Sequence, residues 1–411
     1  MSDASEFRFL TLDDVATKGK TVFVRVDINS PLDPKTKQII DDTRIRMTQY
    51  TLESLHEAKV VVGSHQGRPG DEDFTSLEAH ARLLQKHVKQ RVTFVQDTMG
   101  PEARKQIRNL KAGEMLVLDN LRLCSEENIS GTPDKLAGTI MMARLAPLFD
   151  LYVNDAFATA HRVQASIVGF PQLVPAAAGR LMAKELEALR QAYHDPQRPS
   201  VYVIGGAKAE DKLPIIENIL KTGRADRVLV GGVVANVFLR ALGTNFGETG
   251  NRVLDKSPAL LEKARSILNN YKDKIVLPRD LAITRDGKRV EVPAGQRTID
   301  DPVHDIGKET AQQYAEIIRQ SKTVVSSGPL GLFEDKGFEL GSRTALEAMA
   351  AQGACSVVGG GHMGSYASSL GLDKRITHVS TAGGAMLAFL GGQELPGVKA
   401  LLDAARRQKP R

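Results

Sequence analysis

Two lysines, Lys208 and Lys212, stand four residues apart where the apolar run "VYVIGG" gives way to a helical pattern. Positive charge at a helix N-terminus opposes the helix dipole, and like charges at this spacing repel each other. One interpretation is that Glu210 and Asp211 neutralise the two cations. The other is that a larger anion, such as a phosphate, binds at this helix start. Pro214, which is tolerated in a first helical turn, predicts that the helix begins close to Lys212.

Apolar runs rich in Val recur along the chain, and most of them end abruptly at polar or Gly residues. Continuous apolar runs separated by helical segments are typical of parallel strands buried on both faces. The predicted fold class is therefore α/β, with two doubly wound, Rossmann-like parallel sheets. The expected strands lie in "TVFVRVD", "KVVVGSH", "RVTFVQD", "MLVLDN", "LYVNDAF", "VYVIGG", "RVLVGG", "KIVLP", "TVVSSG", "CSVVGGG" and "THVSTAGG".

The domain boundary is expected near residue 175, where "FPQLVPAAAG" interrupts the alternation of strands and helices. The segment "RLMAKELEALRQAYH" then predicts one long helix, which "DPQRPS" ends. We expect a first domain over 1–175, an interdomain helix over 176–195, a second domain over 196–390 and a C-terminal segment over 391–411.

The residues that follow each apolar run are the candidate ligand-binding residues, because open α/β sheets bind ligands outside the carboxyl ends of their strands. In the first domain they are polar or basic, and each alone could simply be solvated. Several arginines converging on one edge suit a small phosphorylated or carboxylated ligand, because guanidinium binds such groups through paired hydrogen bonds. The candidates are Arg25, Asp27, Asn29, Arg44, His65, Arg68, Arg122, Asp155, His161 and Arg162.

In the second domain the strand ends carry glycine, which lets the backbone approach a ligand closely. One pair of glycines indicates only a tight turn, but four in register suggest a nucleotide site. No segment fits G-x-x-x-x-G-K-[ST] or G-x-G-x-x-G with a downstream acid, which disfavours a P-loop enzyme and a nicotinamide oxidoreductase. The glycines are Gly205, Gly206, Gly231, Gly232, Gly359, Gly360, Gly361, Gly383 and Gly384.

Composition excludes several other classes. The chain has 411 residues, a mean hydropathy of -0.22 and no run near the roughly 20 apolar residues of a membrane span. No secretory signal is visible, and the two cysteines suggest neither a disulfide framework nor a metal site, so we expect a reducing cytoplasm. A net charge of +6 with 5% aromatic residues and no basic-aromatic interleaving disfavours nucleic-acid binding. No protein partner is evident.

One domain thus suits a small anion and the other a nucleotide, and phosphoryl transfer needs such a pair to align donor and acceptor away from water. With these residues in view, the chain resembles the phosphoglycerate kinases. The motifs "SHQGRP", "NDAFATAHR", "GGAKAEDK", "GPLGLFE" and "HVSTAGGA" occur in the family's order. The resemblance extends from "VRVDINSPL" to "LPGVKALL", with variations that resemble archaeal members.

The resemblance implies transfer of the acyl phosphate of 1,3-bisphosphoglycerate to ADP, giving ATP and 3-phosphoglycerate. The reaction would need Mg²⁺ with the nucleotide and would proceed in line after domain closure. Arg44, Lys208 and Lys212 would be catalytic, and the C-terminal segment would pack back on the first domain. The implied substrate-binding residues are Asp27, Ile28, Asn29, Arg44, His65, Gln66, Gly67, Arg68, Arg122 and Arg162. The implied nucleotide-binding residues are Lys208, Lys212, Gly231, Glu334, Gly360, Gly361, His362 and Met363.

The sequence departs from the family pattern in three places. His362 and Met363 follow the glycine triplet where the family usually has Asp and then Thr or Ser, so no magnesium ligand is assigned there. Ser326 and Ser327 precede "GPLGLFE" where many members have an Asn beside the Gly, and Ala382 replaces a Gly. A catalytically silent sensor of sugar phosphate or nucleotide on the same fold is the alternative, and the intact Lys208, Lys212 and Arg44 disfavour it.

Overall fold

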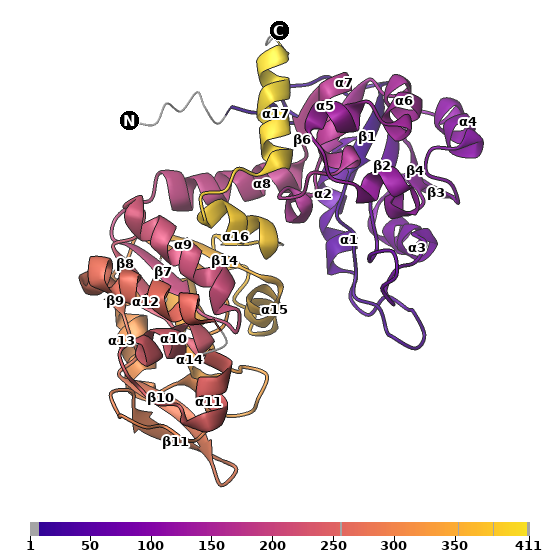
Figure 1. Ribbon diagram of the computed structural model, residues 1–411. Helices are drawn as coiled ribbons and strands as arrows, with labels where there is room; N and C mark the ends of the chain where they lie inside the picture. The colour runs from indigo at the N-terminus through magenta and orange to yellow at the C-terminus, as the bar shows by residue number, and fades with distance from the viewer. Residues whose placement is uncertain (1–7, 255–256, 352, 381, 409–411) are drawn as a thin grey trace. The chain divides into compact units, whose positions relative to one another are not determined.

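The computed structural model describes residues 8–254, 257–351, 353–380 and 382–408, which form two compact units (Figure 1). The first comprises Met1–Leu186 and Glu394–Arg411, and the second comprises Glu187–Gln393. Thr381, within the motif "HVSTAGGA", lies outside the described residues, as do the first seven residues and the last three of the expected domains.

The first unit is built on a six-stranded parallel sheet in the order β3-β4-β2-β1-β5-β6. The chain order reverses at β1, which has β2 on one side and β5 on the other, so the ligand-binding edge of such a sheet is expected beside β1. The three-residue strand β6 was not predicted, because three alanines carry little strand signal. The strands are β1 (Thr21–Arg25), β2 (Lys59–Gly63), β3 (Arg91–Val95), β4 (Glu114–Leu118), β5 (Leu151–Asn154) and β6 (Ala176–Ala178).

Both faces of this sheet are buried, as its continuous apolar strands predict. On one face Val24 packs in a core with Ile45 from α1 and Leu52 from α2. On the other face Phe23 stacks on Phe170 from α7, with ring centroids 4.4 Å apart. The helices are α1 (Thr43–Met47), α2 (Gln49–Ser54), α3 (Glu78–His87), α4 (Pro101–Asn109), α5 (Pro133–Ala137), α6 (Ile140–Leu145), α7 (Phe170–Leu173) and α17 (Pro396–Arg407).

The C-terminal helix α17 belongs to the first unit, where it packs on β6 and α7 (Figure 1). The backbone N–H of Gly397 donates to the carbonyl of Ala160 at 2.9 Å, and Arg407 donates to the carbonyl of Pro171 at 2.7 Å. The helix α8 (Arg180–Leu189) and the π-helical turn Arg190–His194 cover the segment that the sequence predicted as one helix.

The second unit has a parallel sheet in the order β15-β14-β13-β7-β8-β9, which reverses between β7 and β13. It also has an antiparallel sheet in the order β11-β10-β12, whose mixed polar strands the sequence analysis missed. No helix among the described residues is long and apolar enough to cross a membrane. The strands are β7 (Ser200–Ile204), β8 (Arg227–Val230), β9 (Ile275–Val276), β10 (Asp280–Arg285), β11 (Lys288–Pro293), β12 (Val303–Ile306), β13 (Thr323–Ser327), β14 (Cys355–Gly359) and β15 (His378–Val379).

The helix that follows β7 begins earlier than predicted. It is α9, Ala209–Lys221, so Pro214 lies inside the helix rather than in its first turn. A proline there lacks the N–H that would bond the carbonyl of Glu210, and tertiary packing overrides that cost. The other helices of the unit are α10 (Gly232–Ala241), α11 (Gly247–Leu254), α12 (Pro258–Tyr271), α13 (Lys308–Arg319), α14 (Leu340–Ala351), α15 (Gly361–Ser369) and α16 (Gly384–Leu390).

Candidate functional site

The loops after β1 and β2 are tied together at the edge of the first sheet. Arg44, from α1, donates to the Asp27 carboxylate at 2.7 Å, which orients its guanidinium at this edge. The side-chain oxygen of Asn29 accepts the backbone N–H of Gly67 at 2.9 Å. Gly67 has a φ of +63°, and a Cβ there would collide with Asp73, so the turn requires glycine.

Two of the predicted substrate residues hold these loops with their side chains. The Gln66 amide is fully buried: its oxygen accepts the backbone N–H of Ser30 at 2.8 Å and lies 2.9 Å from His80 Nε2, and its nitrogen donates to the carbonyls of Ser30 and Asp73. The Ile28 side chain lies in the hydrophobic core. A ligand bound at this edge would therefore contact the backbone of Gln66 and Ile28 rather than their side chains.

A group of cations surrounds His65 at this edge. Its pKa is held well below its usual value by burial and by the charges of Arg25, Arg122, Arg162 and Arg44. Burial and Arg162 also lower the pKa of Arg122 to about 10. Burial is the first cause of both shifts and neighbouring guanidinium charge is the second, so closely spaced positive charges at this edge favour an anionic ligand.

The donors that remain available define how that anion would be held. The Arg122 Nη1 donates to the Gly67 carbonyl, while its buried Nε has no hydrogen-bond partner among the described residues. Arg162 Nη1 lies 3.2 Å from His65 Nε2, and Arg68 is exposed. Guanidinium groups presented in this way suit phosphate or carboxylate oxygens.

The candidates after β5 have different places. Asp155 is fully buried, and its Oδ1 accepts the backbone N–H groups of Leu181 and Met182 at 2.9 and 3.1 Å, at the start of α8. Burial raises the pKa of Asp155 to about 7. His161 is half-buried, and burial and Arg162 lower its pKa. Asp155 therefore anchors α8 rather than offering an oxygen to a ligand.

In the second unit, glycines bring the ends of β7 and β13 close together at the point where the strand order reverses. The backbone N–H of Gly205 donates to the Ser327 carbonyl at 3.0 Å, and a Cβ on Gly205 would collide with the Pro329 carbonyl. Gly206 has a φ of +99° and Gly232 a φ of +58°. These glycines are required by close backbone approach and leave the edge unobstructed by side chains.

The two lysines at the start of α9 lie in different environments. Lys208 is exposed and precedes the first helical residue. Lys212 is buried, and its ammonium donates to the Ser327 hydroxyl at 2.7 Å. Burial lowers the pKa of Lys212 to about 8, and Asp211 opposes the shift only in part. Lys212 therefore lies at the switch point of the second sheet as a poorly neutralised cation.

The predicted phosphate end of the nucleotide site lies at the start of α15. Gly360 has a φ of +100°, and both Gly360 and Gly361 face open space. His362 and Glu334 are exposed, whereas the Met363 side chain belongs to the hydrophobic core. Met363 can thus contribute its backbone N–H to this helix start but not its side chain. Gly231, the residue before α10, packs closely on Leu330.

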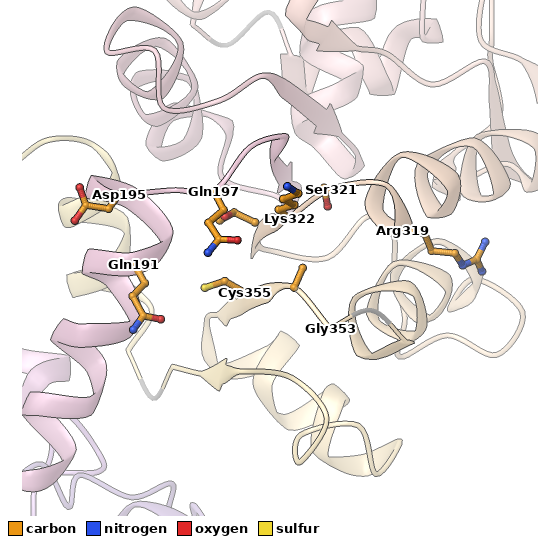
Figure 2. A pocket seen from close by; sticks show the side chains of 10 residues that line it. Gln191, Asp195, Gln197, Arg319, Ser321, Lys322, Gly353 and Cys355 are labelled. Atoms are coloured by element: carbon orange, nitrogen blue, oxygen red, sulfur yellow. The ribbon is translucent and has the colours of Figure 1, made fainter.

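A cavity lies at the opposite end of the second sheet, where β13 and β14 begin (Figure 2). It has a volume of about 420 Å³, and its lining includes Thr323 and Cys355, the first residues of β13 and β14. The two cysteines of the chain are not disulfide-bonded. No group of three or more His, Cys, Asp or Glu side chains that would hold a metal ion occurs in the described parts of the chain.

Comparison with known proteins assigns the chain to a family. The phosphoglycerate kinase model matches residues 12–393. A phosphoglycerate kinase of Methanothermus fervidus is 44% identical over 409 residues, covering 98% of each chain. The crystal structure of phosphoglycerate kinase from Pyrococcus horikoshii OT3 is 41% identical with a TM-score of 0.87, covering 97% of this chain and 100% of that one. The enzyme structure from Coxiella burnetii is 33% identical with a TM-score of 0.82, covering 98% and 100%.

Two parallel-sheet units, one with a cationic and one with a glycine-rich strand-end edge, define a two-domain α/β phosphotransferase. The chain belongs to the phosphoglycerate kinase family, as the motifs predicted. Glu127 and Ser166 lie beneath the cationic edge and could not be recognised from the sequence. Their types are ordinary for a loop, and only the fold places them beside Arg25.

Proposed function

We propose that the chain catalyses the reversible transfer of the acyl phosphate of 1,3-bisphosphoglycerate to ADP, giving ATP and 3-phosphoglycerate in glycolysis and gluconeogenesis. The cationic cluster around His65 is the observation that carries this proposal. Burial, and then the charges of Arg25, Arg122, Arg162 and Arg44, lower the pKa of this imidazole. An anion with several oxygens relieves that charge more fully than any single carboxylate of the chain.

The substrate would be held at both of its ends in the first unit. Arg122, Arg162 and His65 would bind one end, and the exposed Arg68 would bind the phosphate remote from the reaction. Asp27 and Asn29 would shape the loop, with Ile28, Gln66 and Gly67 contributing backbone groups or support. Arg44, oriented by its 2.7 Å contact with Asp27, would face the transferring group.

In the second unit the nucleotide would lie along the glycine-rich edge, with its phosphates near the helix starts. Lys208 and Lys212 would attract those phosphates, and Gly231, Gly360, Gly361 and the backbone of His362 and Met363 would line the path. Glu334 would contact the ribose. Phosphoryl transfer needs little covalent chemistry from the protein, so positioning by Arg44 and Lys212 after domain closure would supply most of the catalysis.

Magnesium would accompany the nucleotide rather than occupy a site built by the protein. The described residues offer no group of three or more metal-binding side chains. Mg²⁺ commonly keeps several waters and binds through substrate phosphates and one or two carboxylates, so such a cage is not required. The metal would neutralise phosphate charge. We further propose a cytoplasmic location, which suits the two unpaired cysteines.

An assay of ATP formation tests this function. The full chain, supplied with 1,3-bisphosphoglycerate, ADP and Mg²⁺, should form ATP, and omission of any one component should abolish the signal. Arg44→Ala should lower kcat by about 10²–10³, as loss of one preorganised donor does. A chain that binds both substrates in calorimetry yet forms no ATP would be a sensor on this fold and would refute the proposal.

A further inference from the structure

A chain of fully buried polar groups lies beneath the cationic edge of the first unit. Ser166 donates its hydroxyl to Glu127 Oε1 at 2.5 Å and its backbone N–H to Oε2 at 2.9 Å. The same hydroxyl accepts Arg25 Nε at 2.8 Å. The side chains of Glu127, Ser166 and Arg25 are all fully buried. None of the three can touch a ligand in solvent, so any role in function is exerted through another residue.

Arg25 is held from every side of its guanidinium. Besides Ser166, it donates through Nη1 to the Val26 carbonyl, and its Nη2 lies 3.8 Å from Glu127 Oε1. Nη2 also lies 3.3 Å from His65 Nδ1. Burying an arginine is costly without such partners, so the site is built to keep this guanidinium in one place.

His65 therefore lies between a fixed and a more accessible guanidinium. Its Nδ1 faces Arg25 at 3.3 Å, and its Nε2 faces Nη1 of the partly exposed Arg162 at 3.2 Å. Burial and the surrounding arginines keep the ring neutral by lowering its pKa. A neutral imidazole has one acceptor nitrogen and one N–H, whereas guanidinium can only donate. Only one of the two arginines can be hydrogen-bonded to this ring.

We propose that Glu127, Ser166 and Arg25 are positioning residues that fix His65 in its Nε2–H tautomer. The immobile Arg25 occupies the Nδ1 lone pair, so the N–H is directed toward Arg162 and the ligand edge. That N–H then donates to an anionic oxygen of the bound substrate, and Arg162 turns to the same anion. The substrate part of this inference rests on the proposed phosphoglycerate site, but the tautomer does not.

The tautomer can be measured in the ligand-free protein. The full chain is labelled with ¹⁵N-histidine, and long-range ¹H–¹⁵N correlation spectra report which ring nitrogen carries the proton. The signals of His65 are assigned by their loss in His65→Asn. We expect Nδ1 of His65 to be unprotonated and Nε2 to be protonated at pH 7.5. A proton on Nδ1 would overturn the inference, and this outcome requires no ligand and no assay of activity.

A variant then tests whether the buried chain sets the tautomer. Ser166→Ala removes the hydroxyl that links Arg25 to Glu127 while leaving both charges in place, and Ser54→Ala is the matched control. Ser54 is partly buried on α2 and donates to the Thr51 carbonyl at 2.7 Å, apart from this chain. Ser166→Ala should mix the two tautomers and raise the KM for 3-phosphoglycerate about tenfold, with the KM for ATP and kcat changed less than twofold.

Unchanged tautomer and KM in folded Ser166→Ala would refute the positioning role. Glu127→Gln provides a second variant, in which Arg25 loses its carboxylate partner. The mixing of tautomers and the rise in KM for 3-phosphoglycerate should be larger than in Ser166→Ala. If Glu127→Gln fails to fold, the wild-type spectrum and the Ser166→Ala variant still test whether the buried groups set the His65 tautomer. Failure of the proposed function gives a different result. A protein that shows the expected His65 tautomer but forms no ATP would support the positioning role of Glu127, Ser166 and Arg25 and would refute only the proposed reaction.

Discussion

Replacement of Lys212 by methionine distinguishes a catalytic role of this lysine from a purely structural one. Methionine matches the length of the aliphatic stem but removes the ammonium that donates to Ser327 at 2.7 Å. The lowering of the Lys212 pKa from 10.5 to about 8 means that holding this charge in the fold costs about 3 kcal/mol. The lost hydrogen bond offsets about 1.5 kcal/mol. Lys212→Met should therefore raise the free energy of unfolding at pH 7 by about 1–2 kcal/mol.

The same substitution should damage catalysis. A fixed positive charge near the transferring phosphoryl group acts mainly in the transition state, so kcat should fall by about 10²–10³ while KM changes less.

The gain in stability depends on pH, because the unfolded chain holds the lysine proton more tightly. Wild-type stability should rise relative to that of Lys212→Met between pH 8 and 10.5, so the variant's advantage shrinks and then reverses at high pH, where only the lost hydrogen bond remains.

Urea unfolding at pH 7 and pH 10, with steady-state kinetics on the same preparations, measures both effects. Lys221→Met is the matched control, because Lys221 is an exposed residue at the last position of α9. It should change both quantities little. A Lys212→Met protein that is less stable than wild type and retains kcat within about threefold, less than half a tenfold step of 1.4 kcal/mol, would show that Lys212 is structural.

Substrate selectivity, the buried Asp155 carboxyl and domain closure can each be tested separately. Arg68→Ala should raise the KM for 3-phosphoglycerate at least tenfold and leave the KM for ATP unchanged in steady-state kinetics; equal effects on both would contradict its assignment. Asp155→Asn should be about 2–4 kcal/mol more stable than wild type at pH 8, because the Asp155 pKa is raised to about 7. Wild-type stability should fall relative to this variant between pH 4 and pH 7, as thermal melts will show. Small-angle scattering should give a smaller radius of gyration with both substrates than with either alone, and no decrease would argue against closure.

The sequence predicted most of the parallel sheets because their strands are continuous apolar runs. The eleven runs named from the sequence correspond to β1–β5, β7–β9 and β13–β15. The antiparallel strands β10–β12 were missed because charged residues such as Arg289 interrupt their apolar pattern. Arg289 belongs to a tertiary network: it lies 3.1 Å from the buried Asp305, a contact that no local pattern signals.

At the site, residue types were predictable from strand ends, but their individual geometry was not. Asp155 follows β5 as a ligand residue would, yet the fold turns its carboxylate to the start of α8. Met363 follows the glycine triplet, yet its side chain packs in the core. In both cases the position along the chain indicated the edge of the sheet, whereas the direction of the side chain depended on neighbours distant in sequence.

The assignment of one substrate to each unit is the central claim, and separate titrations of the full chain test it most directly. With amides observed by NMR, 3-phosphoglycerate should shift Gly67 and Asn29, at the ends of the first sheet. ADP with Mg²⁺ should shift Gly206, Gly232 and Gly361, at the ends of the second. Reversed patterns, or both ligands shifting the same glycines, would contradict the account.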